Sequence, residues 1–544
     1  MVASSPARKS RRRRARVFPG VHKPRGVVHP RVQKVGPERF GIISVDCAKA
    51  RSEWMLCNFY GQVLLPPAQL PHTQGHFQAA LGLVRQATQE HGLKDLLVAV
   101  ERTGNYHLPV KRAFAAAGYD TRIVHPFATK QFRQPANPGN KTDDTDLAAI
   151  HRAAVNGFGL TEPQTTPLFA ELRLLARHRR DLVQKRSAVC CQIREHLEAI
   201  LPGYAACFED LWATPVALEI ARHYPSAETL QLAGEAGLRS WLSSRGLRFH
   251  TATLERVWIW ARLAAPADER ADVHRRVWLA LDADWTEKTR QIRALEVELA
   301  SLLVRTPYVL LLSHPGINVV SAAELAGEMG LISNYAHHRS ITGRAGLFPA
   351  RYQSDEVDRA DGRLIRCANR TLRATLLLIA ANLAKCNHYY RALAATWAAQ
   401  GQDPRHCKVK IASKFCRVAW QIVAGGQVFC HPACRQRDYI LEKLLAFHGE
   451  HATPPGSLLR DLQHAIEQIP RGAYTEEAAP LAAQLAQLQA ARRRGPKPIG
   501  DLLPIVLARL GAGDLQSTAR DQDPGSSDPG ASAATPLFLT GENP

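Results

Sequence analysis

The spacing of apolar residues changes twice along the first 307 residues of this chain. Residues 1–39 have no sustained period and are basic and rich in Pro and Gly, which favours a flexible arm. Residues 40–160 mix short apolar runs with segments of helical period, whereas residues 161–307 are dominated by near-heptad spacing. The pattern predicts an arm, an α/β domain and a helical middle region.

The predicted α/β domain holds short apolar runs separated by amphipathic segments. In chain order we expect strands at 41–45 and 54–63, a helix at 76–91, a strand at 96–100, a helix at 109–117, a strand at 121–124 and a helix at 143–155. Early hairpin strands followed by alternating strand and helix indicate a mixed sheet.

Two long helices are predicted in the middle region, from Leu168 to Ile200 and around 292–302, on either side of residues 202–284. Arg179 and Arg186 interrupt the apolar stripe of the first helix. The helices can pair as an antiparallel coiled coil, dimerise with another copy, or lie as amphipathic helices in a bundle core. The spacing leaves these three arrangements open.

The last third of the chain is predicted to be mostly helical. Residues 308–430 read as a second compact, mostly α domain, and residues 431–515 as a helical extension. Residues 516–544 are rich in Ser, Pro, Gly and Ala, which predicts a disordered tail.

Charge narrows the class of partner. The 544 residues include 70 Lys and Arg against 49 Asp and Glu, a formal net charge of +21. Twelve Lys and Arg and one Glu fall within the first 40 residues. An excess of this size indicates a polyanionic partner, with nucleic acid as the first candidate.

Several classes are disfavoured by what the sequence lacks. No apolar run is long enough for a bilayer, and the basic N-terminus has no apolar signal region. Eleven cysteines without framework spacing suit a reducing compartment, and the spacing from Cys430 to Cys434 fits no standard zinc site. No phosphate-binding loop or dinucleotide fingerprint is present. We therefore expect a cytoplasmic protein with no membrane partner.

Four carboxylates stand at informative positions. Asp46 and Glu101 directly follow predicted buried strands, and Asp143 and Asp146 lie three apart on one face of a predicted helix. If they converge, their repulsion requires a cation, and two Mg²⁺ ions would activate an oxygen for attack on a phosphodiester. Alternatively, Asp46 ends a strand, Glu101 is a surface residue, and the two aspartates cap a helix.

Residues 40–155 resemble the RuvC-type, ribonuclease H-like domain of IS110 family insertion-sequence transposases, which include the Piv-type DNA invertases. The family pattern of Asp after strand one, Glu-x-Thr-Gly-x-Tyr and Lys-Thr-Asp-x-x-Asp is matched by Asp46, Glu101-Arg-Thr-Gly-Asn-Tyr106 and Lys141-Thr-Asp-Asp-Thr-Asp146. The resemblance implies a DEDD metal site at Asp46, Glu101, Asp143 and Asp146, with Mg²⁺ as cofactor and Mn²⁺ as a substitute.

A second part of the resemblance lies within residues 308–430. His314-Pro-Gly-Ile-Asn-Val319 looks like the start of a helix-hairpin-helix segment, whose turn would offer N–H groups to phosphate. Gly343–Pro349 and Gln353-Ser354 resemble the family's Ala-x-x-Gly-Leu-x-Pro and Gln-Ser-Gly segments, which implies that Ser354 is a nucleophile. Asp355 replaces the usual Gly, which adds a Cβ and a negative charge beside the serine.

Basic residues follow the predicted serine segment. Arg363, Arg366, Arg370 and Arg373 are spaced three, four and three apart, so that on a helix they would share one face suited to phosphates. A solvated helix face is the alternative. A smaller basic set consists of Lys408, Lys410, Lys414 and Arg417.

The resemblance implies a transposase or DNA recombinase. Its carboxylates and Ser354 would act together on double-stranded DNA through a phosphoserine link, and the protein would form dimers or tetramers guided by a bridge RNA in the bacterial nucleoid. Two alternatives remain from the residues alone. One is a junction-resolving nuclease that uses water and forms no covalent link to DNA, and the other is an inactive nucleic-acid-binding derivative in which Asp355 marks the decay of the serine site.

Overall fold

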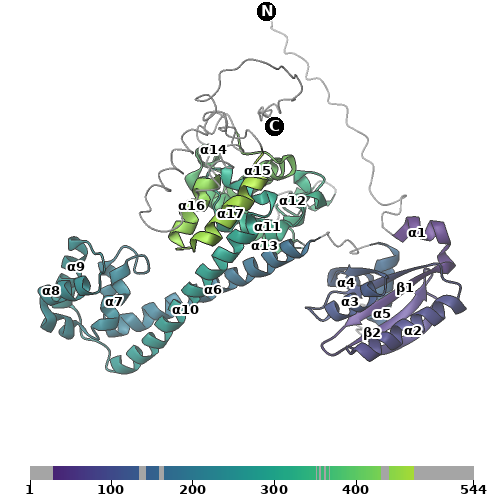
Figure 1. Cartoon of the computed structure of the whole chain (residues 1–544), viewed down its shortest axis with the longest axis horizontal. Helices are drawn as coiled ribbons and strands as arrows, with labels where there is room; N and C mark the ends of the chain where they lie inside the picture. The colour runs from purple at the N-terminus through teal and green to yellow at the C-terminus, as the bar shows by residue number, and fades with distance from the viewer. Residues whose placement is uncertain are drawn as a thin grey trace, which may run out of the picture. The chain divides into compact units, whose positions relative to one another are not determined.

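The chain divides into two compact units, Met1–Pro163 and Gln164–Pro544, which are drawn in Figure 1 and described one at a time. The computed structural model describes residues 28–133, 142–157, 165–350, 352–354, 357–359, 363–366, 368–430 and 440–470. Within these ranges, no helix has the length and apolar character needed to span a membrane.

The first unit is built on one five-stranded sheet with the order β3-β2-β1-β4-β5. The strands are β1 (Phe40–Cys47), β2 (Arg51–Asn58), β3 (Val63–Pro71), β4 (Asp95–Glu101) and β5 (Asp120–Val124). β1, β4 and β5 run parallel, whereas β2 is antiparallel to both β1 and β3. The mixed sheet confirms the predicted α/β class. The β-rich stretch predicted at 54–63 covers parts of two strands, because the chain turns after Asn58 and begins β3 at Val63.

Alternation along the strands divides the core of this unit between two faces of the sheet. Phe40 and Ile42 of β1 lie on the face covered by α5 (Asp143–Val155), in one cluster with Ile150. Ile43 and Val45 lie on the other face, against α2 (Gln74–Glu90) and α3 (His107–Ala116). Every second residue of β1 therefore points toward α5.

The predicted flexible arm is wrong for its last part, because Val28–Val35 forms helix α1. Val28 and Val32 are one turn apart and buried in the cluster beneath α5. Arg31 of the same helix donates two hydrogen bonds to Asp95, at 2.6 and 2.8 Å, and one to Asp120 at 2.6 Å. These partners are 64 and 89 residues away along the chain, so the local composition could not indicate them.

Two long helices, α6 (Pro167–Ile200) and α10 (Ala271–Leu303), lie side by side in the second unit (Figure 1). Arg179 contacts Glu296 and His196 contacts His274, so residue numbers rise along α6 as they fall along α10. The helices are therefore an antiparallel pair within one chain. The end of the pair that holds Ile200 of α6 and Trp278 of α10 carries a separate core. This core also includes α7 (Pro215–His223), α8 (Ala227–Ser244) and α9 (Thr251–Leu263).

The opposite end of this helix pair, which holds Phe169 of α6 and Leu303 of α10, packs in a larger helical core. Its elements are η3 (Pro307–Ser313), α11 (Val319–Met329), η4 (Ile332–Asn334), α12 (His338–Ala345), α13 (Arg370–Cys386), α14 (His388–Ala399), α15 (Pro404–Gly425), α16 (Ile440–Glu450) and α17 (Pro455–Gln468). Because α16 and α17 contribute to the same core, the described part of the predicted 431–515 extension is continuous with this domain. The predicted tail lies outside the described residues.

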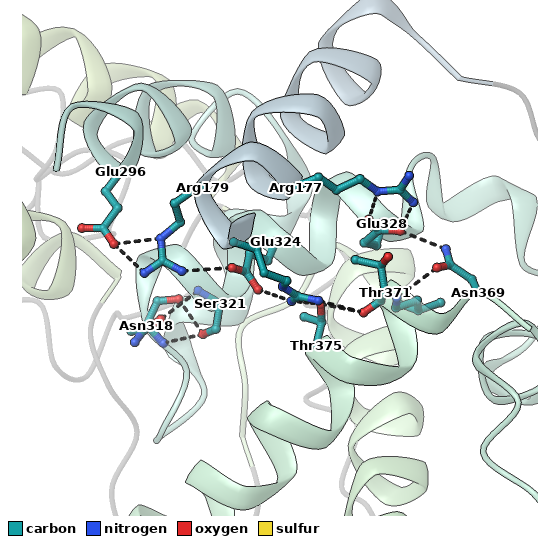
Figure 2. A network of polar contacts seen from close by, with 12 residues as sticks. Arg177, Arg179, Glu296, Asn318, Ser321, Glu324, Glu328, Asn369, Thr371 and Thr375 are labelled. Atoms are coloured by element: carbon teal, nitrogen blue, oxygen red, sulfur yellow. Dashed lines mark hydrogen bonds and ion pairs between the residues drawn. The ribbon is translucent and has the colours of Figure 1, made fainter. Parts of the chain in front are cut away.

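The predicted helix-hairpin-helix-like segment consists of a tight turn followed by α11. Gly316 adopts a φ of +90° in this turn, and the amide groups of Asn382 and Asn387 donate to turn carbonyls at 2.6 and 3.0 Å. Asn318 and Ser321 cap the start of α11 reciprocally (Figure 2). The carbonyls of Pro315 and Gly316 are thus paired within the protein, and phosphate binding by the N–H groups of the turn stays a prediction.

Candidate active site

The carboxyl ends of two neighbouring strands bring Asp46 and Glu101 together. β1 and β4 are parallel, with Val45 opposite Val100, so the next residue of each strand lies at the same edge of the sheet. Asp46 is in phase with Ile42, and Glu101 is in phase with Ala99, both of which contact the α5 cluster. Both carboxyl groups therefore lie on the α5 face.

Helix α5 adds Asp146 to this face. Thr142 caps the helix, since its hydroxyl accepts from the N–H of Thr145 and the Thr145 hydroxyl accepts from the N–H of Thr142. This cap starts the helix at Asp143, where the sequence predicted it. Asp146, one turn into the helix, is 2% exposed, whereas Asp143 is exposed.

The electrostatics of Glu101 show how close these groups are. Glu101 is 8% exposed, and its burial, a hydrogen bond with Asp46 and the charges of Asp46 and Asp146 raise its pKa to about 7. The same two strand-end carboxylates help to raise the pKa of the buried Cys47 thiol, after burial itself. A carboxyl group that keeps its proton near neutral pH marks a site where negative charge is concentrated.

The structure assembles part of the predicted metal set. Arg133, at the end of α4 (Pro126–Arg133), forms an ion pair with Asp146. Within the described residues no three His, Cys, Asp or Glu side chains are grouped closely enough to hold a metal ion. Asp46, Glu101 and Asp146 nevertheless offer only oxygen donors from one face of the sheet, and this donor chemistry fits a hard divalent cation.

Glu53 is a further carboxylate at this edge that the sequence reasoning missed. It lies opposite Asp46 across the β1–β2 ladder, and cross-strand partners share a face. Burial and the charge of Asp143 raise its pKa. Glu53 lay one residue before the predicted 54–63 strand, so a correct start for β2 at Arg51 would have identified it.

Two basic side chains lie directly after the ends of β4 and β5. Arg102 comes after Glu101 and His125 after Val124, and the Arg102 N–H donates to the Val124 carbonyl at 2.9 Å. Burial and the charge of Arg102 lower the pKa of His125, whose Nδ1 accepts from the N–H of Phe127. The rule that selected Asp46 and Glu101, residues directly after strands, would also have selected this pair.

Ser354 lies at the end of a strand in a β-hairpin of the second unit. The hairpin strands are β6 (Tyr352–Ser354) and β7 (Val357–Arg359), and Ser354 is paired with Val357. Further toward its base, the N–H of Ala350 donates to the carbonyl of Arg363 at 2.9 Å. Asp355, the residue that departs from the family pattern, lies outside the described residues.

The four predicted phosphate-binding arginines do not share a helix face, so that prediction is wrong. α13 begins at Arg370, and Arg363 and Arg366 precede it in extended and bent chain. Arg373 turns inward and donates to the carbonyl of Ala345 at 2.8 Å. Arg363, Arg366 and Arg370 are exposed and remain candidates for phosphate contact.

The smaller basic set follows one long helix. Lys410, Lys414 and Arg417 are four and three residues apart on α15, and all three are exposed, as is Lys408. The charge of Arg417 helps to lower the pKa of His338 on α12, after burial, because α12 packs against α15. The possible zinc ligands beyond Cys430 lie outside the described residues.

The sheet order and the acidic edge are consistent with a ribonuclease H-like domain of the DEDD class. Comparison with known families makes this assignment specific. A model described as "Transposase", for the DEDD domain of IS110, matches residues 43–202, and one described as "Transposase IS116/IS110/IS902 family" matches residues 308–395. Residues 43–202 and 308–395 of this chain are thus similar to two domains of IS110 family insertion-sequence transposases.

Curated relatives agree with this family. A "Transposase for insertion sequence element IS1328" from Yersinia enterocolitica is 29% identical over 123 residues, which are 22% of this chain and 36% of the relative. An "Insertion element IS116 uncharacterized 44.8 kDa protein" from Streptomyces clavuligerus is 27% identical over 218 residues, 38% of this chain and 53% of the relative. The matched segments thus span about a third to a half of these relatives' lengths.

Proposed function

We propose that this chain is a DNA transposase that cuts and rejoins DNA strands of an insertion element. The observation that carries the proposal is the convergence of Asp46, Glu101 and Asp146 on one sheet face in a chain that also holds the second family domain. Two matched regions in the order of the family support a complete reaction rather than an isolated nuclease domain.

In the proposed chemistry, the first unit supplies the acidic site. Asp46, Glu101, Asp143 and Asp146 would hold Mg²⁺, which supplies Lewis-acid stabilisation of charge on a phosphate oxygen. Without a metal ion, Glu101 has a pKa of about 7, and a bound cation would hold its carboxylate in the charged form. Its position at the end of β4, beside Asp46, places that carboxylate among the proposed ligands.

The second unit supplies the proposed nucleophile. The hydroxyl oxygen of Ser354 forms a bond to a DNA phosphorus, one bridging P–O bond breaks, and the proton lost by the serine balances the one gained by the leaving oxygen. Attack by a new DNA hydroxyl on the phosphoserine then reverses these bond changes and frees Ser354. Because the link conserves one phosphodiester-type bond, the reaction needs no nucleotide cofactor.

The nucleic-acid partners are part of the proposal. The net charge of +21 and the exposed Lys410, Lys414, Arg417, Arg363, Arg366 and Arg370 suit phosphate backbones of DNA and of a guiding bridge RNA. Binding of the noncoding RNA that flanks the element, compared with a scrambled RNA of equal length, tests the RNA partner. Sedimentation with and without that RNA tests the expected dimer or tetramer.

Trapping the covalent intermediate tests the proposed reaction. Denaturant added during the reaction should leave DNA attached to the peptide that contains Ser354, and Ser354→Ala should lose both adduct and strand exchange while still binding DNA. Mn²⁺ should replace Mg²⁺, whereas Ca²⁺ should permit binding with little cleavage. Full cleavage by Ser354→Ala with no adduct would instead favour the water-using nuclease.

A further inference from the structure

One arginine joins the two sides of the hairpin that carries Ser354. Arg373 donates from Nε to the carbonyl of Ala345 at 2.8 Å and from Nη2 to the carbonyl of Ile365. Ala345 ends α12, before the hairpin, and Ile365 follows its second strand. A planar guanidinium has its donors in a fixed fork, so this one side chain sets the separation of the chain entering and leaving the hairpin.

Gly346 permits this close approach. Its φ is +63°, in the left-handed region that favours glycine, and a Cβ at this position would lie 2.4 Å from Nη2 of Arg373 and 2.7 Å from the Cβ of Ala368. A side chain here would therefore displace the guanidinium or the backbone. The sequence match at Gly343–Pro349 thus includes a position with a direct packing reason.

Asn369 connects the same region to α11. Its side-chain oxygen caps α13 by accepting from the N–H of Leu372 at 3.0 Å, and its backbone N–H donates to the carbonyl of Arg344 at 2.9 Å. Its amide nitrogen donates to Glu328 at 2.9 Å, as Figure 2 shows. The start of α13 is therefore tied both to the end of α12 and to a buried carboxylate.

Glu328 extends the connection to the long helix α6. It is 2% exposed, and Arg177 donates two hydrogen bonds to it at 2.6 and 3.0 Å (Figure 2). Burial by itself would raise its pKa, but the hydrogen bonds from Arg177 and Asn369 outweigh burial and hold the pKa below its usual value. Glu328 is therefore charged at neutral pH, and its hydrogen bonds with Arg177 and Asn369 are charge-assisted.

We propose that Glu328, Asn369 and Arg373 are positioning residues for the hairpin that carries Ser354. We call these three residues the hairpin clamp. The inference rests on the proposed function, since it assumes that the position of Ser354 limits the rate of covalent attack. The clamp acts on the hairpin base, between Phe348 and Ile365, where the backbone pair is described.

Backbone hydrogen exchange measures the clamp without requiring catalysis. In the full chain, Arg373→Gln and Glu328→Gln should each speed exchange of the Ala350 and Ile365 amides about tenfold, the effect of losing roughly one charge-assisted hydrogen bond. Exchange in the last turns of α13 should stay unchanged, which shows that the domain remains folded. Arg370→Gln, which removes an exposed charge from the same helix, should leave hairpin exchange unchanged.

The same variants are then compared in adduct formation on a DNA substrate. Arg373→Gln and Glu328→Gln should slow the formation of the Ser354–DNA adduct about tenfold at saturating DNA, with DNA affinity and its salt dependence unchanged. Arg373→Lys, which can reach one carbonyl, should be intermediate. Arg370→Gln should instead lower affinity and flatten the salt dependence.

The other possible outcomes distinguish a failure of the hairpin clamp from a failure of the proposed serine mechanism. If wild-type protein forms no adduct but the variants still loosen the hairpin, the serine mechanism fails and the structural clamp stands without a catalytic role. Loosened exchange with adduct formation at the wild-type rate would overturn the positioning role. Unchanged exchange in both variants would overturn the clamp, and loss of affinity in Arg373→Gln would make Arg373 a phosphate contact.

Discussion

Two buried glutamates, one in each unit, have pKa values shifted in opposite directions. Glu101 is 8% exposed, faces Asp46 and Asp146, and has its pKa raised to about 7. Glu328 is 2% exposed and accepts hydrogen bonds from Arg177 and Asn369, which lower its pKa. Burial raises the pKa of both, so the difference arises from their neighbours.

The difference separates acids that lie against one another from acids that are neutralised by arginines. Around Glu324, next to Glu328 on α11, Arg179 donates at 3.1 Å and Arg180 at 2.5 Å, so buried negative charge is matched by fixed positive charge (Figure 2). At the sheet edge, Arg133 contacts Asp146 while Asp46 and Glu101 contact each other. Removing one member of a buried ion pair leaves an uncompensated charge, whereas removing one of two opposed acids relieves repulsion.

The largest expected effect comes from removing an acid at the sheet edge. Asp46→Ala or Asp146→Ala should lower strand cleavage by roughly 10³-fold, since metal-ion stabilisation supplies several kcal/mol, and should leave DNA and RNA binding largely intact. Cleavage assays at fixed Mg²⁺, together with filter binding, check this. Cleavage at the wild-type rate in either variant would remove that carboxylate from the mechanism.

Removing a paired acid should instead cost stability. Glu324→Gln leaves Arg179 and Arg180 without their shared carboxylate and should lower the free energy of unfolding by about 3 kcal/mol, measured from urea unfolding. Glu287→Gln removes an exposed partner of Arg290 on α10 and should give no measurable shift. Equal small effects in both variants would mean that the buried network is no stronger than a surface pair.

The two glutamates should also give opposite pH dependences of stability. Without metal, the folded protein keeps the Glu101 proton up to about pH 7, whereas the unfolded chain releases it near 4.5. Folding therefore takes up a proton between these values, and this contribution to stability is lost as pH rises toward 7. Glu101→Gln should remove that loss and raise the melting temperature at pH 8 by a few degrees.

Glu328 should behave in the reverse sense. Its pKa is lowered on folding, so its contribution is present at neutral pH and is lost as pH falls below the ordinary value of 4.5. Glu328→Gln should therefore lower the melting temperature at pH 7 and have little effect at the lowest pH at which the protein stays folded. A drop of the same size at both pH values would show that the charge of Glu328 is not what stabilises the network.

The smallest expected effect concerns two exposed arginines. Arg366 and Arg370 are exposed, and replacing both with Gln should reduce the slope of log affinity against log salt by about two, nearly independently of DNA sequence. Arg290→Gln, at an exposed ion pair with Glu287, serves as the control. A sequence-selective loss would mean that the pair reads bases, and an unchanged slope would leave it a solvated surface.

Local signals in the sequence were sufficient for much of the first unit. Continuous apolar runs placed β1 and β4, and Asp46 and Glu101 share one edge of the sheet near the ends of these strands. The helix predicted at 143–155 matches α5, which begins at Asp143. These features depend on periods and caps that span only a few residues, so the sequence alone contains them.

Tertiary contacts decided what the local pattern left open. In the sequence, Arg373 looks equivalent to Arg363, Arg366 and Arg370. Only its hydrogen bonds to the carbonyls of Ala345 and Ile365 distinguish it from these exposed arginines. α1 is stabilised because Val28 and Val32 are buried in a core and Arg31 donates hydrogen bonds to Asp95 and Asp120, which are far away along the chain. The pairing of α6 with α10 was likewise one of three arrangements that the heptad spacing allowed.

The sequence by itself determined which residue types follow which periods, and therefore the buried strands and the acids at their ends. Only the tertiary structure decided which charges meet, because charges on separate segments reach hydrogen-bonding distance through the fold rather than through their spacing. Glu101 and Glu328 are both glutamates within or at the end of apolar segments. Glu101 contacts an aspartate and Glu328 contacts an arginine, and this difference shifts their pKa values in opposite directions.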